Sequence, residues 1–134
     1  MSNKFTTQYR IYYEDTDAGG VVYYANYLKF FERARTDFLR SLTISQSDLI
    51  SSHNLAFVVR KCDIDYLSPA KLDDMIDVTV SVTEIRNASI VMDQTITIGD
   101  IILSKLKVKI ACVNVTDFRP IKIPENIAHQ LQRN

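Results

Sequence analysis

A stretch of acidic, aromatic and glycine residues at positions 12–27 carries the residue types that could do chemistry. Its sequence is Tyr-Tyr-Glu-Asp-Thr-Asp-Ala-Gly-Gly-Val-Val-Tyr-Tyr-Ala-Asn-Tyr, and it contains three carboxylates, those of Glu14, Asp15 and Asp17, and two of the chain's three glycines. A long amphipathic segment, Leu28 to Leu42, follows directly. A loop that leads into a helix start places carboxylates beside backbone N–H groups that have no partner within the helix. The sequence therefore predicts a polar site at this junction.

Three interpretations of this acidic loop compete. In the first, Asp15, Asp17 and the glycines only form a turn, because Asp bonds its own backbone and Gly accepts positive φ. In the second, Glu14, Asp15 and Asp17 bind a divalent metal, although the loop lacks the later carboxylate of a calcium loop and has no histidine near it. In the third, a carboxylate is a base or nucleophile, and N–H groups at the helix start hold a developing oxyanion. Hydrolysis of a carbonyl ester needs both of these, a base or nucleophile and N–H donors for the oxyanion.

The segment after the loop has the spacing of a helix with one apolar face. Apolar residues recur at intervals of four, three, four and four, at Tyr27, Phe31, Ala34, Phe38 and Leu42, and the stripe is widened by Leu28 and Leu39. We expect Asn26 to cap this helix. A face this wide needs a sheet to lie on.

Strand patterns occupy most of the remaining chain. The first is predicted at residues 6–13, and four more follow a polar segment, 44–54, which we expect to be a loop with at most one helical turn. These four are predicted at 55–67, around 77–83, at 89–98 and at 101–115, with turns at 86–88 and 99–100. We expect them to form an antiparallel meander. Pro124 is well placed to open a short terminal helix, so the class predicted is α+β, as one domain over residues 1–134.

The composition restricts the partners. Of 134 residues, 46% are hydrophobic and 24% charged, and sixteen basic residues balance sixteen acidic ones, so we expect neither nucleic acid nor an anionic membrane as the main partner. No stretch of eighteen apolar residues could span a membrane, and the first residues have no apolar segment of signal-peptide type. We expect a cytoplasmic protein.

The cysteines and histidines are too few and too dispersed for a metal or disulfide framework. Cys62 and Cys112 are predicted to be reduced core residues, and neither His53 nor His129 has a Cys or Asp neighbour at the spacing of zinc ligands.

The acidic stretch, followed by Phe30-Phe31-Glu32-Arg33-Ala34-Arg35, resembles the hotdog-fold acyl-CoA thioesterases of the 4-hydroxybenzoyl-CoA thioesterase family. It is most similar to the branch associated with the bacterial Tol–Pal system. Segments 57–61 and 65–74 and the pair Arg119-Pro120 extend the resemblance over nearly the whole chain. The resemblance implies a long helix wrapped by a five-stranded antiparallel sheet. It also implies homodimers with continuous sheets, or homotetramers, and active sites at the subunit interface.

The function implied by the resemblance is hydrolysis of the thioester of an acyl-CoA, with acyl carrier protein as an alternative carrier. By similarity, Asp17 is the catalytic aspartate, as nucleophile or as general base, and the backbone N–H of Tyr24 polarises the carbonyl. No metal or redox cofactor is implied. The branch commonly has histidine where this chain has Tyr24, so the acyl preference or the activity itself is open.

Five further residues are predicted to bind substrate. Tyr23 and Tyr27 are pocket walls or core residues. Arg60, Lys61 and Lys71 are candidates for the phosphates of coenzyme A, and a solvated strand edge is the alternative.

Two other functions compete with hydrolysis. A non-catalytic module would bind acyl-CoA or acyl carrier protein, or act as an envelope-associated scaffold, and Tyr24 in place of histidine is the feature that favours it. A dehydratase of 3-hydroxyacyl thioesters fits less well, because neither His53 nor His129 lies in a matching motif.

Overall fold

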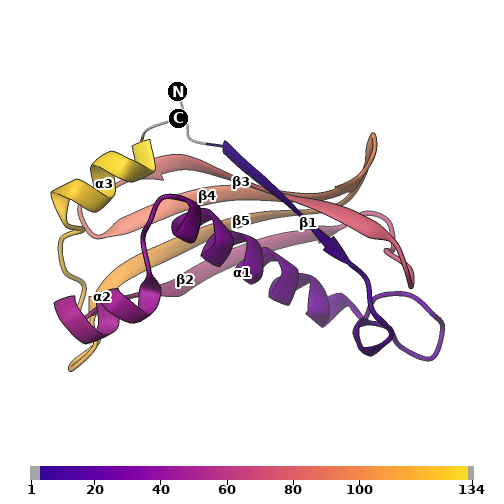
Figure 1. Cartoon of the computed structure of the whole chain (residues 1–134), viewed down its shortest axis with the longest axis horizontal. Coiled ribbons are helices and arrows are strands. Elements are labelled where there is room, and N and C mark those ends of the chain that lie inside the picture. The colour runs from indigo at the N-terminus through magenta and orange to yellow at the C-terminus, as the bar shows by residue number, and fades with distance from the viewer. Residues whose placement is uncertain (1–3, 133–134) are drawn as a thin grey trace.

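In the computed structural model, which describes residues 4–132, a curved antiparallel sheet encloses one long helix (Figure 1). The elements are β1 (Lys4–Arg10), α1 (Tyr24–Ser41), α2 (Gln46–His53), β2 (Leu55–Tyr66), β3 (Met75–Ile85), β4 (Ser89–Ile98), β5 (Ile101–Asn114) and α3 (Glu125–Gln132). A short 3-10 helix, Tyr13–Asp15, lies in the acidic loop. The predicted α+β architecture is confirmed.

The order of the strands corrects one prediction. The sheet runs β1-β3-β4-β5-β2, so β3, β4 and β5 form a meander, but β2 pairs with β5 at the far edge. The predicted meander of four consecutive strands is therefore wrong. Alternation of apolar and polar residues specifies which face of a strand is buried but not which strand lies beside it. Consecutive strands are neighbours only about two-thirds of the time.

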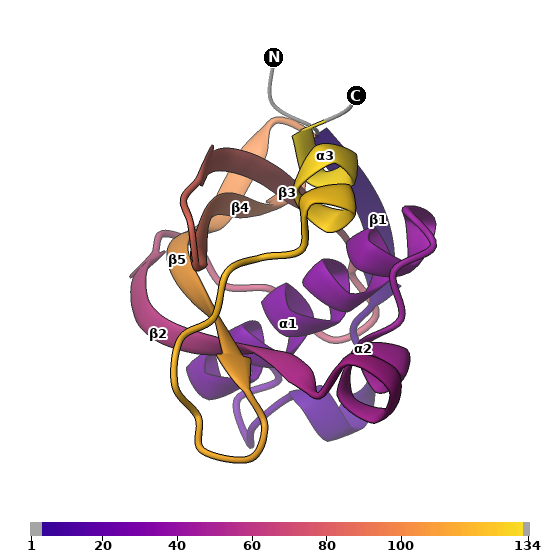
Figure 2. The same cartoon turned by 90° about the vertical axis from the view of Figure 1, so that its left-hand side faces the viewer.

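The core lies between α1 and the concave face of the sheet, which curls around the helix (Figure 2). The buried side chains of α1 are Tyr27, Phe30, Phe31, Ala34, Phe38 and Leu39. Opposite them, β3 buries Val78, Val80 and Val82, as its alternation predicts. Leu28, which was expected to widen the apolar stripe, is instead 43% exposed.

Two predicted element ends are wrong around the acidic loop. The first strand ends at Arg10, because the backbone of Ile11 leaves the sheet ladder and bonds the 73–74 segment. The helix begins at Tyr24, and Asn26 does not cap it. Asn26 lies within the first turn, where its Nδ2 donates to the Asp15 carbonyl at 2.9 Å. Its side chain therefore fixes the loop to the helix.

Most of the polar segment 44–54 is a helix, Gln46–His53, rather than a loop. The Ser45 hydroxyl caps α2 by accepting from the Asp48 N–H at 3.3 Å, and Asn54 ends it in the left-handed conformation. Leu49 is the buried residue of α2, so the segment lacks the apolar periodicity that predicts a helix. Among residues 4–132, no helix has both the length and the apolar character to span a membrane.

The two cysteines differ in environment. Cys112 is buried in β5, as predicted, and burial raises the pKa of its thiol. Cys62 is exposed, so its assignment to the core is wrong. The reason is the position of β2 at the edge of the sheet, where residues 4–132 supply no further strand beside it.

Replacement of Phe31 should test the core. Phe31 is 0% exposed, and Phe31→Ala leaves a cavity, so we expect a loss of about 3–5 kcal/mol in the free energy of unfolding. Urea denaturation at one fixed protein concentration measures it. Lys29→Ala, on the exposed face of α1, is the matched control and should change stability by no more than about 0.5 kcal/mol.

Candidate active site

Asp17 lies at the start of a tight turn that its own backbone closes. Its N–H donates to the Val21 carbonyl at 3.0 Å, and its carbonyl accepts from Gly20 at 3.1 Å. Gly20 has φ +78°, a conformation that favours glycine. The Gly19 N–H donates to Asp17 Oδ1 at 2.8 Å, and a Cβ at Gly19 would lie only 3.3 Å from that oxygen. The turn therefore orients the carboxylate of an exposed residue through one of its two oxygens.

The start of α1 supplies a backbone donor near this turn. The Asp15 carbonyl accepts from the Tyr23 N–H at 3.3 Å and from the Asn26 side chain, which holds the loop against the first turn of the helix. Within residues 4–132, the Tyr24 N–H has no hydrogen-bond acceptor. The N-terminal end of a helix carries partial positive charge. Tyr24 thus presents a free donor suited to a developing oxyanion.

The connection between β2 and β3 supports the other side of the loop. The Ala70 carbonyl accepts from the Val22 N–H at 2.8 Å, and the Ala70 N–H donates to the Tyr27 hydroxyl at 2.9 Å. Val21 forms an isolated antiparallel bridge with Lys71. Lys71 is therefore brought beside the acidic loop, and its role in binding phosphate stays a prediction.

Four tyrosines form a cluster next to the helix start. The ring of Tyr24 lies 4.8 Å from that of Tyr23 and 5.7 Å from that of Tyr66, which is also 5.4 Å from Tyr27. Tyr27 is buried and the other three are half-exposed, so only those three can wall an open site. Burial raises the pKa of Tyr27, and the Tyr24 hydroxyl raises that of Tyr23.

Tyr66 was not predicted as a site residue. Tyr66 lies at the end of β2, on the same face as Ile64. This position could have indicated a site residue only if the elements that lie beside β2 had been known.

Arg60 and Lys61 lie elsewhere. The register of β2 shifts between Val59 and Lys61, so Arg60 lies in a bulge, and Lys61 pairs with Lys109 on the sheet face that points away from α1. One chain does not bring these two cations together with Lys71.

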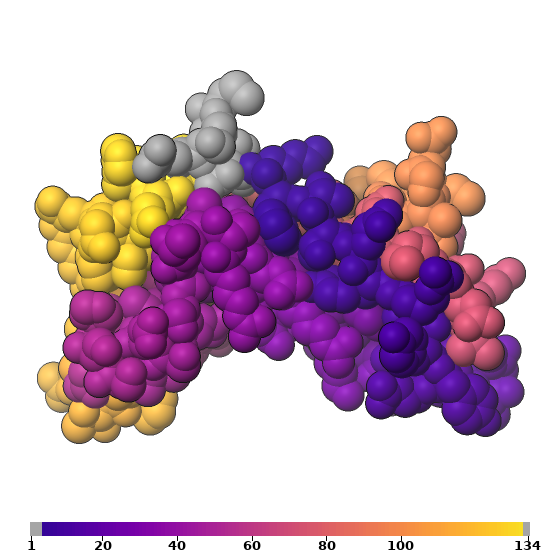
Figure 3. All heavy atoms as spheres, in the orientation of Figure 1, coloured from indigo at the N-terminus to yellow at the C-terminus, as the bar shows by residue number. Residues whose placement is uncertain are grey.

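The metal interpretation of the loop finds no ligand cluster. Among residues 4–132, no group of three His, Cys, Asp or Glu side chains could hold a metal ion. The Asp15 carboxylate accepts from the Tyr12 N–H at 2.8 Å, so it caps its own loop. The helices α2, which contains His53, and α3, which contains His129, lie at the end of the molecule opposite the loop (Figures 1 and 3).

Comparison with known proteins identifies the family. The sequence model of the thioesterase superfamily matches residues 19–105. The chain belongs to this superfamily. A thioesterase of Haemophilus influenzae, "Acyl-CoA thioesterase YbgC", is 46% identical over 95% of this chain and 93% of its own length. "Acyl-CoA thioester hydrolase YbgC" of Escherichia coli is 42% identical over 92% of each chain.

Solved structures of thioesterases share the fold. A probable thioesterase from Bartonella henselae superimposes with a TM-score of 0.85 and 36% identity, over 92% of this chain and 100% of that one. A 1,4-dihydroxy-2-naphthoyl-CoA thioesterase from Synechocystis has a TM-score of 0.89, over 96% of each chain, but is only 23% identical and so informs the fold alone. The predicted hotdog fold is confirmed.

The Tyr27 hydroxyl provides a test of how the site is supported. Tyr27→Phe leaves the N–H of Ala70, a fully buried residue, without its acceptor, so we expect a loss of about 1–3 kcal/mol in the free energy of unfolding. Tyr13→Phe is the control, because that ring is 83% exposed. Equal denaturation midpoints for the two variants would show that this bond does not stabilise the fold.

Proposed function

We propose that this protein hydrolyses the thioester bond of an acyl-CoA, releasing a carboxylic acid and the free thiol of coenzyme A. The observation that carries the proposal is identity of 42–46%, over at least 92% of both chains, with proteins named as acyl-CoA thioesterases. An acyl group carried by acyl carrier protein would present the same bond.

The site geometry supports a division of roles. The substrate carbonyl oxygen accepts from the free Tyr24 N–H, and the partial positive charge at the start of α1 stabilises the oxyanion that forms. As general base, Asp17 takes a proton from water while the water oxygen bonds to the carbonyl carbon. The carbon–sulfur bond then breaks, and the thiolate leaves and takes up a proton.

A covalent route uses the same residues. As nucleophile, the Asp17 carboxylate would attack the carbonyl carbon directly and expel the thiolate of coenzyme A as the carbon–sulfur bond breaks, which leaves a mixed anhydride. Water then cleaves the anhydride to the carboxylic acid and the free Asp17 carboxylate, and the thiolate takes up a proton. The exposed position of Asp17 serves both routes, and both need the Tyr24 N–H.

Replacement of Asp17 is the principal test. Asp17→Asn keeps an oxygen that can accept from Gly19 but removes the charge, so we expect kcat to fall about a hundredfold or more. Thiol release from a panel of acyl-CoAs measures it. Glu14→Gln makes the same chemical change in the same loop and should retain activity. Equal rates for Asp17→Asn and the natural chain would reject Asp17, and tight acyl-CoA binding with no turnover by the natural chain would favour the binding module.

We propose that the functional unit is a homodimer joined through β2. This strand lies at the edge of the sheet, and edge strands offer unpaired backbone groups to another chain. Its side chains are unusually open for a strand beside a core, since Val59 is 52% and Tyr66 44% exposed. A two-fold axis through the middle of β2 would join the two sheets.

The bulge in β2 restricts the register of this pairing. Before the bulge, Phe57 and Val59 face α1, and after it Ile64 and Tyr66 do. Centring the two-fold axis on the bulge places Phe57 opposite the partner's Ile64, so inward residues face inward residues. The acidic loop of one chain, which adjoins Tyr66 through Tyr24, then lies beside the Leu55 end of the other chain's β2.

The remaining predictions depend on this arrangement. Arg60 and Lys61 would lie at the dimer axis and Lys71 at the acidic loop, each a candidate for a phosphate of coenzyme A. Assembly into homotetramers, a cytoplasmic location and the lack of a cofactor stay predictions.

A charge on the β2 edge should separate the subunits. We expect Val59→Glu to shift the protein from dimer to monomer in sedimentation and to lower thioester hydrolysis, because pairing would bury the new carboxylate on the apolar inner face of the joined sheets. Ile101→Glu, at an equally exposed apolar residue beside the β4–β5 turn, is the control and should remain dimeric. A dimer that survives the Val59 change would indicate another interface.

A further inference from the structure

The ring of Tyr66 connects the end of β2 to the start of α1. Its centroid lies 5.7 Å from that of Tyr24 and 5.4 Å from that of Tyr27, with an edge-to-face arrangement in both pairs. Tyr24 is the first residue of α1 and Tyr27 the fourth, so the two contacts span the first turn of the helix. Edge-to-face pairs of aromatic rings stabilise a structure beyond the burial of their surface.

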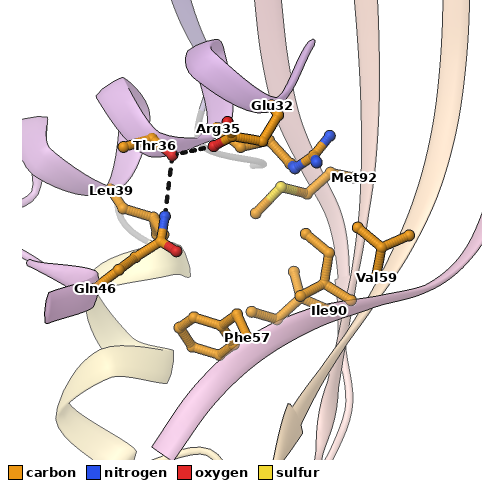
Figure 4. Close-up of a pocket in the computed structure, with 10 residues that line it drawn as sticks. Glu32, Arg35, Thr36, Leu39, Gln46, Phe57, Val59, Ile90 and Met92 are labelled. Carbon is orange, nitrogen blue, oxygen red and sulfur yellow. Dashed lines mark hydrogen bonds between the residues drawn. The ribbon is translucent and has the colours of Figure 1, made fainter. Parts of the chain in front are cut away.

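Along the middle of α1, by contrast, the helix and β2 do not pack tightly. A cavity of about 120 Å³ lies between them (Figure 4), and the residues that line it from these two elements include Thr36, Leu39, Phe57 and Val59. The aromatic contacts of β2 with α1 lie at the helix start instead. Support from this strand is therefore concentrated where Tyr24 begins the helix.

The strand end that carries Tyr66 is firmly held. Tyr66 pairs with Ser104 of β5, and the hydroxyl of this buried serine donates to the Asp65 carbonyl at 2.7 Å. On the other side of Tyr66, the Leu67 N–H donates to the Leu103 carbonyl at 2.9 Å. The backbone is fixed on both sides of Tyr66, so its ring is a rigid support.

The helix start lacks a side-chain cap. Tyr23, which precedes α1, makes no capping hydrogen bond with its side chain. The Tyr23 N–H and the Asn26 side chain both donate to the Asp15 carbonyl, which belongs to the acidic loop rather than to the sheet. Helix ends fray, and their first N–H groups have no partner within the helix. Fraying here would displace the Tyr24 N–H.

We propose that Tyr66 is a positioning residue for thioester hydrolysis, whose ring holds the first turn of α1 so that the Tyr24 N–H lies where the oxyanion forms. This proposal rests on the proposed function and adds a residue that acts through another. Within residues 4–132 the Tyr66 hydroxyl has no hydrogen-bond partner, so the role belongs to the ring. Because an oxyanion donor must be held in place before the reaction, a loosened donor lowers kcat more than it weakens substrate binding.

The proposed dimer places this ring at the subunit interface. There Phe57 lies opposite Ile64 of the partner subunit, so Leu55 of the partner subunit lies opposite Tyr66. The Tyr66 side chain is 44% exposed in one chain, and this neighbour would cover part of it. The strand that joins the subunits would thus also support the oxyanion donor.

Substitutions at Tyr66 separate the ring from the hydroxyl. We expect Tyr66→Ala to lower kcat about tenfold and to change KM by no more than about twofold, since outright loss of one oxyanion donor costs about a hundred- to a thousandfold. Tyr66→Phe keeps the ring and should retain the natural rate. Tyr66→Leu keeps an apolar side chain for the subunit interface and should show an intermediate loss in kcat. Ile101→Ala, which removes another exposed apolar side chain, is the control.

Two unreactive analogues locate the loss at the oxyanion donor. Both have a methylene group in place of the sulfur of the best acyl-CoA substrate, and one keeps the carbonyl while the other has a second methylene there. Because only the carbonyl accepts from the Tyr24 N–H, Tyr66→Ala should raise the inhibition constant of the carbonyl analogue several-fold and leave the other unchanged. A residue that only stabilised the fold or the dimer would affect both analogues alike.

Thermal denaturation and sedimentation at the assay concentration check that each variant is folded and dimeric, and Tyr66→Leu replaces Tyr66→Ala in the comparison if the latter is not. Natural kcat in this variant, equal weakening of both analogues, or the same loss in Tyr66→Phe as in Tyr66→Ala would overturn the inference. Each of these results leaves thioester hydrolysis by the natural chain standing. No thiol release by the natural chain from any acyl-CoA would reject the proposed function and this inference with it.

Discussion

The crossing connection between β2 and β3 is the constraint on which the site depends. Ala70 is fully buried, so both of its backbone groups need partners, and it finds them in the Tyr27 hydroxyl and the Val22 N–H. Two residues on, the Leu72 N–H donates to the Gly20 carbonyl at 3.2 Å. The segment that carries the chain from one edge strand to the interior of the sheet is thus also the platform for the acidic loop. Strand order and site geometry are therefore set together.

The second constraint is a polar pair inside an apolar core. Gln94 lies on the concave face of β4, where Met92 and Ile96 flank it along the strand, and an unpaired amide there would be costly. The Phe31 carbonyl and the Arg35 guanidinium satisfy it. Apolar residues of similar volume often give equal or better stability than buried charged groups. The pair fixes the orientation of the Arg35 guanidinium between α1 and β4.

The sequence predicted the local features of this molecule better than its long-range ones. Periodicity located α1 and the strands, and the glycines and carboxylates of residues 14–20 predicted a polar loop. The family resemblance selected Asp17 among its three carboxylates. Periodicity could not predict that β2 crosses to β5, because alternation carries no information about the neighbouring strand. The sequence did not predict α2, because Leu49 is the buried residue of this helix and one buried residue gives no apolar periodicity. The bond between Arg35 and Gln94 was not predicted, because a single arginine beside an apolar stripe has the same sequence pattern whether it faces solvent or the sheet.

The bulge at Arg60 has a consequence for the proposed dimer. Because it shifts the inward face from odd to even positions, the two-fold axis must fall between two residues rather than on one. With the axis between Arg60 and Lys61, each cation lies opposite the other type in the partner subunit. Like charges directly opposite one another destabilise a strand pair. A bound phosphate would remove that repulsion. Arg60 and Lys61 lie away from the acidic loop of their own chain, but in the proposed dimer they form a candidate site for the phosphates of coenzyme A.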